Sequence, residues 1–159
     1  NTGLKAAYLE NFITDLAKSN GKEGYNVIAA SKCLSADVNV GFDPCFPDVV
    51  DHKNCAYLNN GVVLTKYTGS RGKCGTSDAS AEFIAEISRM LNDAGGIWQT
   101  GELGKVDLGG GGTVSMFVAR LGMDVLDIGV PVLSMHSPFE TTSKLDIYMM
   151  YKAFCEFYK

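Results

Sequence analysis

The chain has 159 residues, which suits a single domain, and it carries a formal net charge of −4 with 46% hydrophobic and 20% charged residues. An acidic balance without any block of basic residues argues against a nucleic-acid partner. No apolar run is long enough to cross a bilayer, and no signal-peptide pattern opens the chain, so we expect no membrane association.

Five cysteines are scattered along the chain, and none of them forms a CxxC pair. Their odd number and irregular spacing disfavour a structural zinc knuckle and a disulfide framework. We therefore predict reduced, mostly buried thiols and a cytoplasmic protein. The cysteines are Cys33, Cys45, Cys55, Cys74 and Cys155.

The first third of the chain is predicted to form a helix, a strand and a long loop. Apolar residues at helical spacing predict a helix over 4–18, and a more β-like composition predicts a strand within 27–40. Asp37 stands where the apolar part of that strand ends, as a turn carboxylate or as a metal ligand presented by a strand end. Residues 43–60 are rich in proline and asparagine and are interpreted as a loop, in which we expect His52 to be solvated.

A second strand and a basic loop follow. Residues 61–67 are β-branched and predict a strand that ends near Lys66. Residues 68–77 are glycine-rich and carry Arg71 and Lys73, which is typical of a flexible loop. Such a loop could hold an anionic group or could simply be solvated.

The next predicted elements are a helix and a short strand. Ser77 or Asp78 is expected to cap a helix whose apolar stripe runs over 83–91 and which ends within 92–96. Residues 97–100 then predict a short strand.

A run of four glycines, 109–112, leads through Thr113 into a short predicted helix over 114–121, closed by Gly122. Glycines before a helix let the backbone approach a ligand closely, and the free N–H groups there favour anions. The run matches no nucleotide-binding pattern, so the alternative is a tight turn with Thr113 as the cap.

The last part of the chain predicts a strand over 124–129, an apolar segment over 131–135 and a long helix over 143–158. The apolar segment presents His136, which we interpret as a metal ligand. The alternative is a histidine buried in the core. Because helices alternate with strands, we expect an α/β fold with helices covering a mixed, largely parallel sheet.

One aspartate and one histidine do not complete a metal site. A catalytic zinc needs three protein ligands and an open position, and a hydrolase also needs a general base. Asp37 and His136 therefore supply half a site at most.

Several stretches resemble, in the same order, the C-terminal part of the aspartyl aminopeptidase and vacuolar aminopeptidase I family of dinuclear zinc exopeptidases. The resemblance runs from about residue 4 to residue 158. It is carried by SADVNVGFDP, GVVLTKYTGSRGKCGTSDASAEF, KVDLGGGGTV and DIGVPVLSMHSPFETTSKLD.

The resemblance implies a three-layer helix-sheet-helix catalytic domain that is interrupted by an inserted dimerisation domain. Residues 1–159 would be the C-terminal segment of that domain, and the N-terminal segment and the insertion would be absent. It also implies a peptide substrate, two zinc ions, replaceable by cobalt or manganese, and a homo-oligomeric parent enzyme.

The family's metal ligands fall on Asp37 and His136, one for each zinc. Glu140 matches a recurrent family position and is expected to support the ligand histidine. Its alternative role is that of a carboxylate near a helix N-terminus.

The family's substrate-binding positions fall on a lysine at a strand end and on the glycine-rich turn. The lysine would contact the substrate, and the turn would line the pocket through its backbone. These residues are Lys66, Gly111, Gly112 and Thr113.

The chain also departs from the family pattern. Val40 replaces the histidine with which the aspartate-preferring branch contacts its substrate, and Arg71 and Lys73 have no aligned role. The general-base glutamate would lie upstream, so the isolated chain is expected to be inactive and to bind zinc weakly. Two other functions stay open: a non-catalytic module that binds an anion or small molecule, and a structural segment whose exposed sheet edge mediates assembly.

Overall fold

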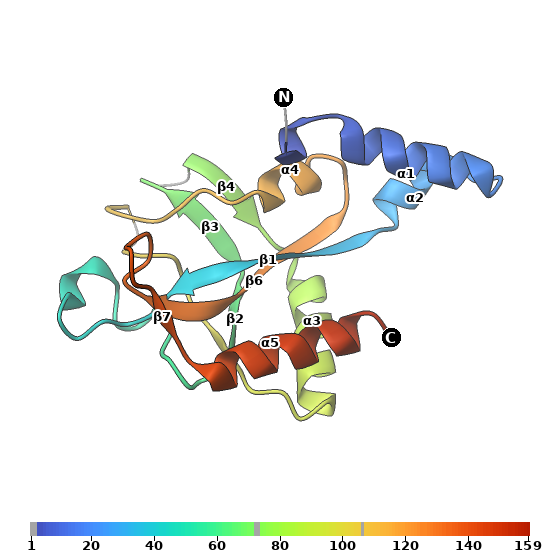
Figure 1. Cartoon of the computed structure of the whole chain (residues 1–159). Coiled ribbons are helices and arrows are strands. Elements are labelled where there is room, and N and C mark those ends of the chain that lie inside the picture. Colours follow the sequence, from blue (N-terminus) through green and yellow to red (C-terminus); the bar gives the residue numbers. More distant parts are fainter. Residues whose placement is uncertain (1–2, 72–73, 106) are drawn as a thin grey trace.

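A mixed β-sheet with the strand order β1-β6-β2-β5 organises the chain (Figure 1). The computed structural model describes residues 3–71, 74–105 and 107–159, so Lys73 lies outside the described residues.

The central strand β6 (Asp124–Leu133) pairs in parallel with β1 (Lys32–Val40) and antiparallel with β2 (Val62–Thr65). β2 in turn pairs in parallel with β5 (Trp98–Thr100), and β7 (Thr141–Thr142) folds back antiparallel on the end of β6. The predicted α/β class with a mixed, largely parallel sheet is confirmed.

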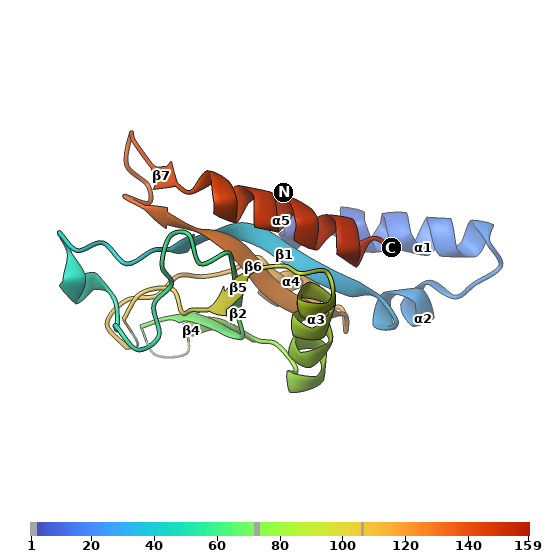
Figure 2. The same cartoon turned by 90° about the horizontal axis from the view of Figure 1, so that it is seen from below.

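Two helices, α3 (Ala81–Asp93) and α5 (Lys144–Phe157), cover one face of this sheet (Figures 1 and 2). Side chains alternate across a strand, so the apolar residues of one face meet the apolar stripes of the helices. A fully buried leucine or isoleucine there stabilises the fold by about 1.5–3 kcal/mol. The buried core on this face includes Val62, Leu64, Phe83, Ile87, Leu91, Leu126, Ile128, Met149 and Ala153.

The other face is covered by the short helix α4 (Ser115–Ala119) and by a hairpin of β3 (Tyr67–Ser70) and β4 (Cys74–Asp78). The predicted third layer is therefore one short helix and a two-stranded hairpin. Much of this face is polar although it is buried, as Ser35, Asn39 and Thr65 illustrate. Figure 1 shows the hairpin and α4 on the side of the sheet opposite α5.

The N-terminal helices lie at one end of the sheet (Figure 1). α1 (Tyr8–Ser19) packs on α2 (Gly24–Ala29) and follows a 3₁₀ turn, η1 (Gly3–Lys5). A second 3₁₀ turn, η2 (Pro47–Val49), interrupts the long loop. No helix within the described parts of the chain is long and apolar enough to cross a membrane.

Two segments differ from the sequence-based expectation. Residues 27–30, predicted as strand, belong to the end of α2, where a helical turn places Ile28 against Val118 and Val125. The hydroxyl of Ser31 closes this turn by donating to the carbonyl of Val27 (2.7 Å). The described part of residues 68–77, predicted as a loop, forms most of the β3–β4 hairpin. Thr68 and Ser77 pair across the hairpin and are both buried, a pairing that composition alone did not indicate.

Smaller predictions also needed correction. Ser80, and neither Ser77 nor Asp78, caps α3 by accepting a hydrogen bond from the backbone N–H of Phe83 (3.2 Å). The apolar segment after residue 129 continues β6 as far as Leu133.

The thiols are less buried than predicted: Cys45 and Cys155 are exposed, Cys33 is half-buried and only Cys55 is buried among the four whose side chains are described. His52 is exposed as predicted, although its ring packs on Phe42 with centroids 4.7 Å apart.

Candidate functional site

Asp37 lies inside β1, three residues before the strand ends, and its side chain is exposed. The expectation that it would stand at a strand end is therefore met only in part. It pairs with Gly129 of β6, and one of its carboxylate oxygens, Oδ1, accepts the backbone N–H of Val38 (2.8 Å). The carboxylate is accessible to a ligand from the polar face of the sheet.

His136 lies in the turn that joins β6 to β7, and its side chain is exposed. The alternative of a buried core histidine is therefore wrong. Its φ of 68° is in the left-handed region, which a non-glycine residue adopts only when neighbouring groups hold it there. The carboxylate of Glu140 accepts the backbone N–H of His136 and holds this turn. Glu140 thus contacts the main chain of the predicted ligand.

The structure shows no hydrogen bond or ion pair between Asp37 and His136. Asp37 lies in β1, and His136 lies in the turn that follows β6, the parallel neighbour of β1. Within residues 3–71, 74–105 and 107–159, no three His, Cys, Asp or Glu side chains are grouped so that they could hold a metal ion. Carboxylate and imidazole are suitable zinc ligands, but the described residues do not complete a zinc site.

A cavity of about 370 Å³ lies on the polar face of the sheet, and we call it the central hollow. Its walls come from β1, β6, the end of β2, β3 and the glycine-rich loop that enters α4. Three predicted site residues, Asp37, Gly112 and Thr113, therefore meet in one cavity. The polar residues that line it are Lys5, Ser35, Asp37, Asn39, Thr65, Thr68, Thr113 and Asp127.

Asp127 is the residue of this hollow that sequence reasoning missed. Its Oδ1 accepts the hydroxyl of Thr113 (2.6 Å), and its Oδ2 accepts the hydroxyl of Ser115 (2.9 Å). Thr68 lies at the limit of hydrogen bonding, 3.4 Å from Oδ2. An aspartate within an apolar strand, on the same face as Asp37's partner Gly129, was the available signal.

Asn39 adds a second polar group to the wall. Its side-chain amide donates to the hydroxyl of Thr65 (2.7 Å), and both residues are buried. Its Oδ1 is enclosed and has no hydrogen-bond partner within the described residues, which is costly for a buried amide.

Lys66 lies away from the central hollow. It forms an ion pair with Asp78, the last residue of β4, and lines a separate cavity of about 180 Å³ together with Asn54 and Glu102. Gly111 packs against Leu103, whose Cδ2 would lie 2.3 Å from a Cβ added at that glycine. Of the predicted substrate residues, Lys66 lines this cavity, Gly112 and Thr113 line the central hollow, and Gly111 lines neither.

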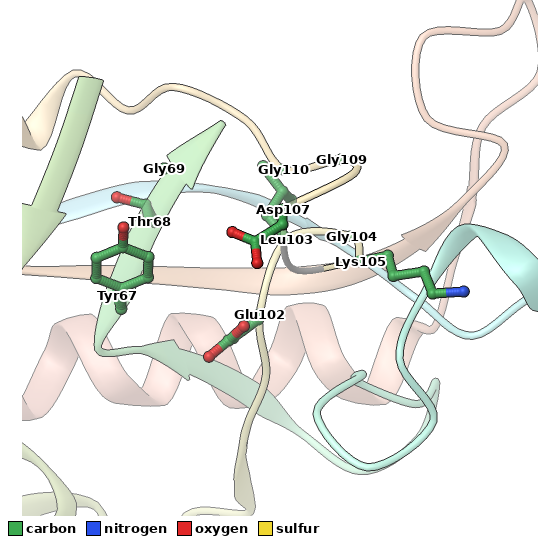
Figure 3. A pocket seen from close by; sticks show the side chains of 10 residues that line it. All are labelled: Tyr67, Thr68, Gly69, Glu102, Leu103, Gly104, Lys105, Asp107, Gly109 and Gly110. Carbon is green, nitrogen blue, oxygen red and sulfur yellow. The ribbon is translucent and has the colours of Figure 1, made fainter. Parts of the chain in front are cut away.

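A third and smaller cavity, of about 90 Å³, lies between β3 and the loop over 102–110 (Figure 3). In that view the carboxylates of Glu102 and Asp107 face the space beside the ring of Tyr67, and the side chain of Lys105 points away. Residues of both the glycine-rich loop and the hairpin line this cavity.

Among the described thiols, Cys33 of β1 is influenced by the carboxylate of Asp127. Burial, followed by the negative charge of Asp127, raises the pKa of the Cys33 thiol above its ordinary value. Cys33 is therefore a poor nucleophile at neutral pH.

Comparisons with known proteins agree with this architecture. A model of the family described as aminopeptidase I zinc metalloprotease (M18) matches residues 1–158. A probable M18 family aminopeptidase 1 from Clostridium acetobutylicum is 47% identical over 155 residues, which are 92% of this chain and 32% of the relative.

Solved structures show the same fold. An M18 aminopeptidase from Thermotoga maritima has a TM-score of 0.93 and 43% identity over 98% of this chain and 36% of its own. Aminopeptidase I from Clostridium acetobutylicum has a TM-score of 0.90 and 45% identity over 99% of this chain and 34% of its own.

A mixed α/β sheet covered by helices is the architecture that the chain shares with these solved M18 aminopeptidases. The chain belongs to the M18 family of aminopeptidase I zinc metalloproteases. It spans about a third of the length of the relatives that it matches.

Proposed function

We propose that the chain is the C-terminal segment of the catalytic domain of a zinc metalloaminopeptidase, which removes N-terminal residues from peptides. The observation that carries the proposal is the central hollow, where a metal-type carboxylate, Asp37, faces the glycine-rich wall of Gly112 and Thr113. Membership of the M18 family supports the same chemistry. The N-terminal segment and the inserted dimerisation domain of the parent would lie outside residues 1–159.

In this proposal Asp37 and His136 each give one ligand to a different ion of a zinc pair, for which cobalt or manganese could substitute. Zinc, when bound, would activate a water for attack on the peptide carbonyl. The remaining ligands and the general-base glutamate would come from the rest of the parent. Glu140 would keep His136 in its turn.

The substrate would be bound by the residues around the hollow. Gly112 and Thr113 would line it with backbone groups, Gly111 would support that wall against Leu103, and Lys66 would contact the peptide from the neighbouring cavity. We expect Lys66 to leave Asp78 for the substrate.

The alternative of an anion-binding module receives less support. Lys66 is already paired with Asp78, and two carboxylates, Asp37 and Asp127, line the hollow together with a single lysine, Lys5. An anion would be repelled by this charge balance.

The test compares the two histidines of the chain in the longer parent protein. His136→Ala should remove about one of two zinc ions per chain and abolish hydrolysis of leucyl and aspartyl substrates, because it deletes a ligand. His52→Ala is the matched control, and it should keep both metal and activity, since His52 is an exposed loop residue.

Retention of zinc and activity in His136→Ala would sink the proposal. The isolated 159-residue chain should be inactive and should bind zinc weakly by calorimetry, and turnover by that chain alone would contradict the shared site. A homo-oligomeric parent that resides in the cytoplasm stays a prediction, which sedimentation and cell fractionation would test.

A further inference from the structure

The glycine-rich loop owes its shape to groups outside it. Four successive glycines have the largest conformational freedom of any residues, so their sequence alone specifies no single backbone path. A Cβ added at Gly112 would meet nothing within 4 Å, so the side of this glycine where a side chain would stand is open. The contacts that hold this part of the loop in the structure are made by its neighbours.

One end of the loop is fixed by the hairpin. The backbone N–H of Arg71 donates to the carbonyl of Gly109 (3.1 Å), and a Cβ at Gly110 would lie 2.1 Å from the carbonyl oxygen of Gly69. The loop backbone therefore touches β3 at residues 109–110, at the far side from Gly112.

The other end is fixed by Asp127. The hydroxyl of Thr113 donates to Asp127 (2.6 Å) and accepts the backbone N–H of Ser115 (3.0 Å), and Ser115, which is fully buried, donates its own hydroxyl to the same carboxylate (2.9 Å). A hydroxyl has one proton to give, so the carboxylate is the acceptor that satisfies both residues. Hydrogen bonds to an ionised acceptor are roughly twice as strong as neutral ones.

Asp127 lies on a strand that is paired on both sides. It lies in the middle of β6, where it pairs with Ser35 of β1 on one side and with Thr65 of β2 on the other. Asp37 is two residues beyond Ser35 on the same face, and it lines the same hollow. Asp127 thus connects the glycine-rich wall of the hollow to the strand pair that carries the predicted metal ligand.

We propose that Asp127 is a positioning residue for the substrate: through Thr113 and Ser115 it holds the backbone of Gly112 and Thr113 at a fixed distance from Asp37. This inference rests on the proposed aminopeptidase function. Asp127 itself binds neither metal nor peptide in this arrangement. Its loss should therefore weaken peptide binding and leave the metal in place.

The experiment uses the active, zinc-loaded parent and a leucyl peptide substrate. Asp127→Asn and Thr113→Val each remove a hydrogen bond from the anchor, and each should raise KM by about two- to tenfold, the equivalent of one lost hydrogen bond, with kcat and zinc content little changed. Thr113→Ser keeps the hydroxyl, so its KM should stay close to the wild-type value, in contrast to that of Thr113→Val. Ser31→Ala is the control, because it removes a half-buried hydroxyl bonded at 2.7 Å to Val27, far along the chain from the loop.

A second readout does not depend on turnover. Amide hydrogen exchange in residues 109–113 should be faster in Asp127→Asn and Thr113→Val than in wild type, and unchanged in Ser31→Ala. If both variants keep the wild-type KM and exchange rates, or if they lose zinc together with kcat, the positioning role is wrong. An inactive wild-type parent would instead refute the proposed function, and wild-type exchange rates in both variants would still refute the anchor.

Discussion

Asp127 and Asp146 each accept hydrogen bonds at both carboxylate oxygens, and neither forms an ion pair within the described residues. Asp127 accepts two hydroxyls at the edge of the central hollow, whereas Asp146 is fully buried at the start of α5 and accepts the backbone N–H groups of Asn59 (2.8 Å) and Gly61 (2.7 Å). The first carboxylate shapes a cavity wall. The second fixes the turn that enters β2, where both Asn59 and Gly61 have positive φ values.

Replacing Asp146 with asparagine should destabilise the protein by about 1–3 kcal/mol. Only one oxygen of an amide can accept, so one of the two backbone N–H groups would face the NH₂ group and lose its bond. Urea unfolding measures the change. Asp43→Asn is the matched control, because Asp43 accepts only one backbone N–H, from Cys45 (2.8 Å), in an exposed loop. Equal stabilities of the two variants would contradict this assignment.

The reactivity of the Cys33 thiol reports on the negative charge of Asp127. Burial and that charge both disfavour the thiolate, so they raise the pKa of Cys33 and delay its alkylation to higher pH. The same shift makes the protonated thiol contribute stability below its unfolded-state pKa, and that contribution is lost as pH rises through the folded-state pKa.

We therefore expect iodoacetamide to modify Cys33 with a pH midpoint above that of a cysteine in an unfolded peptide, as followed by mass spectrometry. Asp127→Asn should lower the midpoint of Cys33 part of the way, because burial remains. Asp124→Asn, a change in the same strand, should leave it where it is. Identical pH profiles for wild type and Asp127→Asn would show that the carboxylate does not act on the thiol.

At the residue scale, sequence patterns pointed to Asp37, His136 and Glu140 but not to Asp127 or Asp146. A residue next to a proline turn or a strand end can be recognised from its neighbours in the sequence. Asp127 and Asp146 sit inside an apolar strand and a helix, and their roles depend on groups from Thr113, Asn59 and Gly61 that only folding brings near. A single sequence does not reveal such hydrogen-bond partners, because they are distant along the chain.

At the element scale, the long periodic segments were predictable, whereas two of the short ones were not. Helices α3 and α5 and strand β6 each bury a regular apolar pattern, which sequence shows directly. Residues 27–30 and the β3–β4 hairpin are short, and their local propensities were outweighed by packing of Ile28 and Thr68. Tertiary burial therefore decided these elements.

The β1–β6 ladder depends on the absence of a side chain at Gly129. A Cβ there would lie 2.7 Å from the carbonyl oxygen of Asp37 and 3.1 Å from the carbonyl carbon of Val38. Gly129→Ala must push the two strands apart beside the predicted metal ligand. We expect a loss of about 1–3 kcal/mol in unfolding free energy, as for other overpacked sites.

Gly112→Ala is the matched comparison for stability, since its added Cβ would meet nothing within 4 Å. Thermal unfolding should therefore separate the two alanine variants, and amide exchange in residues 36–40 should accelerate only for Gly129→Ala. A Gly129→Ala protein as stable as wild type would mean that the strands can shift without cost.

At the scale of the whole molecule, two helices leave aromatic surface exposed. On α1, Tyr8 (77% exposed) and Phe12 (55% exposed) stack with centroids 6.3 Å apart. On α5, Tyr148 and Tyr151 stack with centroids 6.3 Å apart on the side away from the sheet. Exposed apolar surface favours association, so we expect these helix faces to be covered by other protein in the parent.

The chain spans about a third of the length of its relatives. The two metal ligands that the family resemblance predicts for it, Asp37 and His136, would therefore form only part of the proposed site. The hydrophobic percentage of the sequence counts buried and exposed aromatic residues alike, so it gives no sign of these surfaces. Which aromatic residues are exposed depends on the direction in which each helix face points.

We expect the isolated chain to self-associate through these faces as its concentration rises, because burying aromatic surface is favourable at about 25 cal/mol per Å². Phe12→Lys should reduce the association seen by sedimentation velocity without changing the unfolding midpoint, since the side chain lies on a helix surface. Phe139→Lys is the control, because Phe139 is more exposed (87%) but lies in a loop outside both stacked pairs. If the chain stays monomeric at every concentration, or if Phe139→Lys has the larger effect, the helix faces are not the cohesive surface.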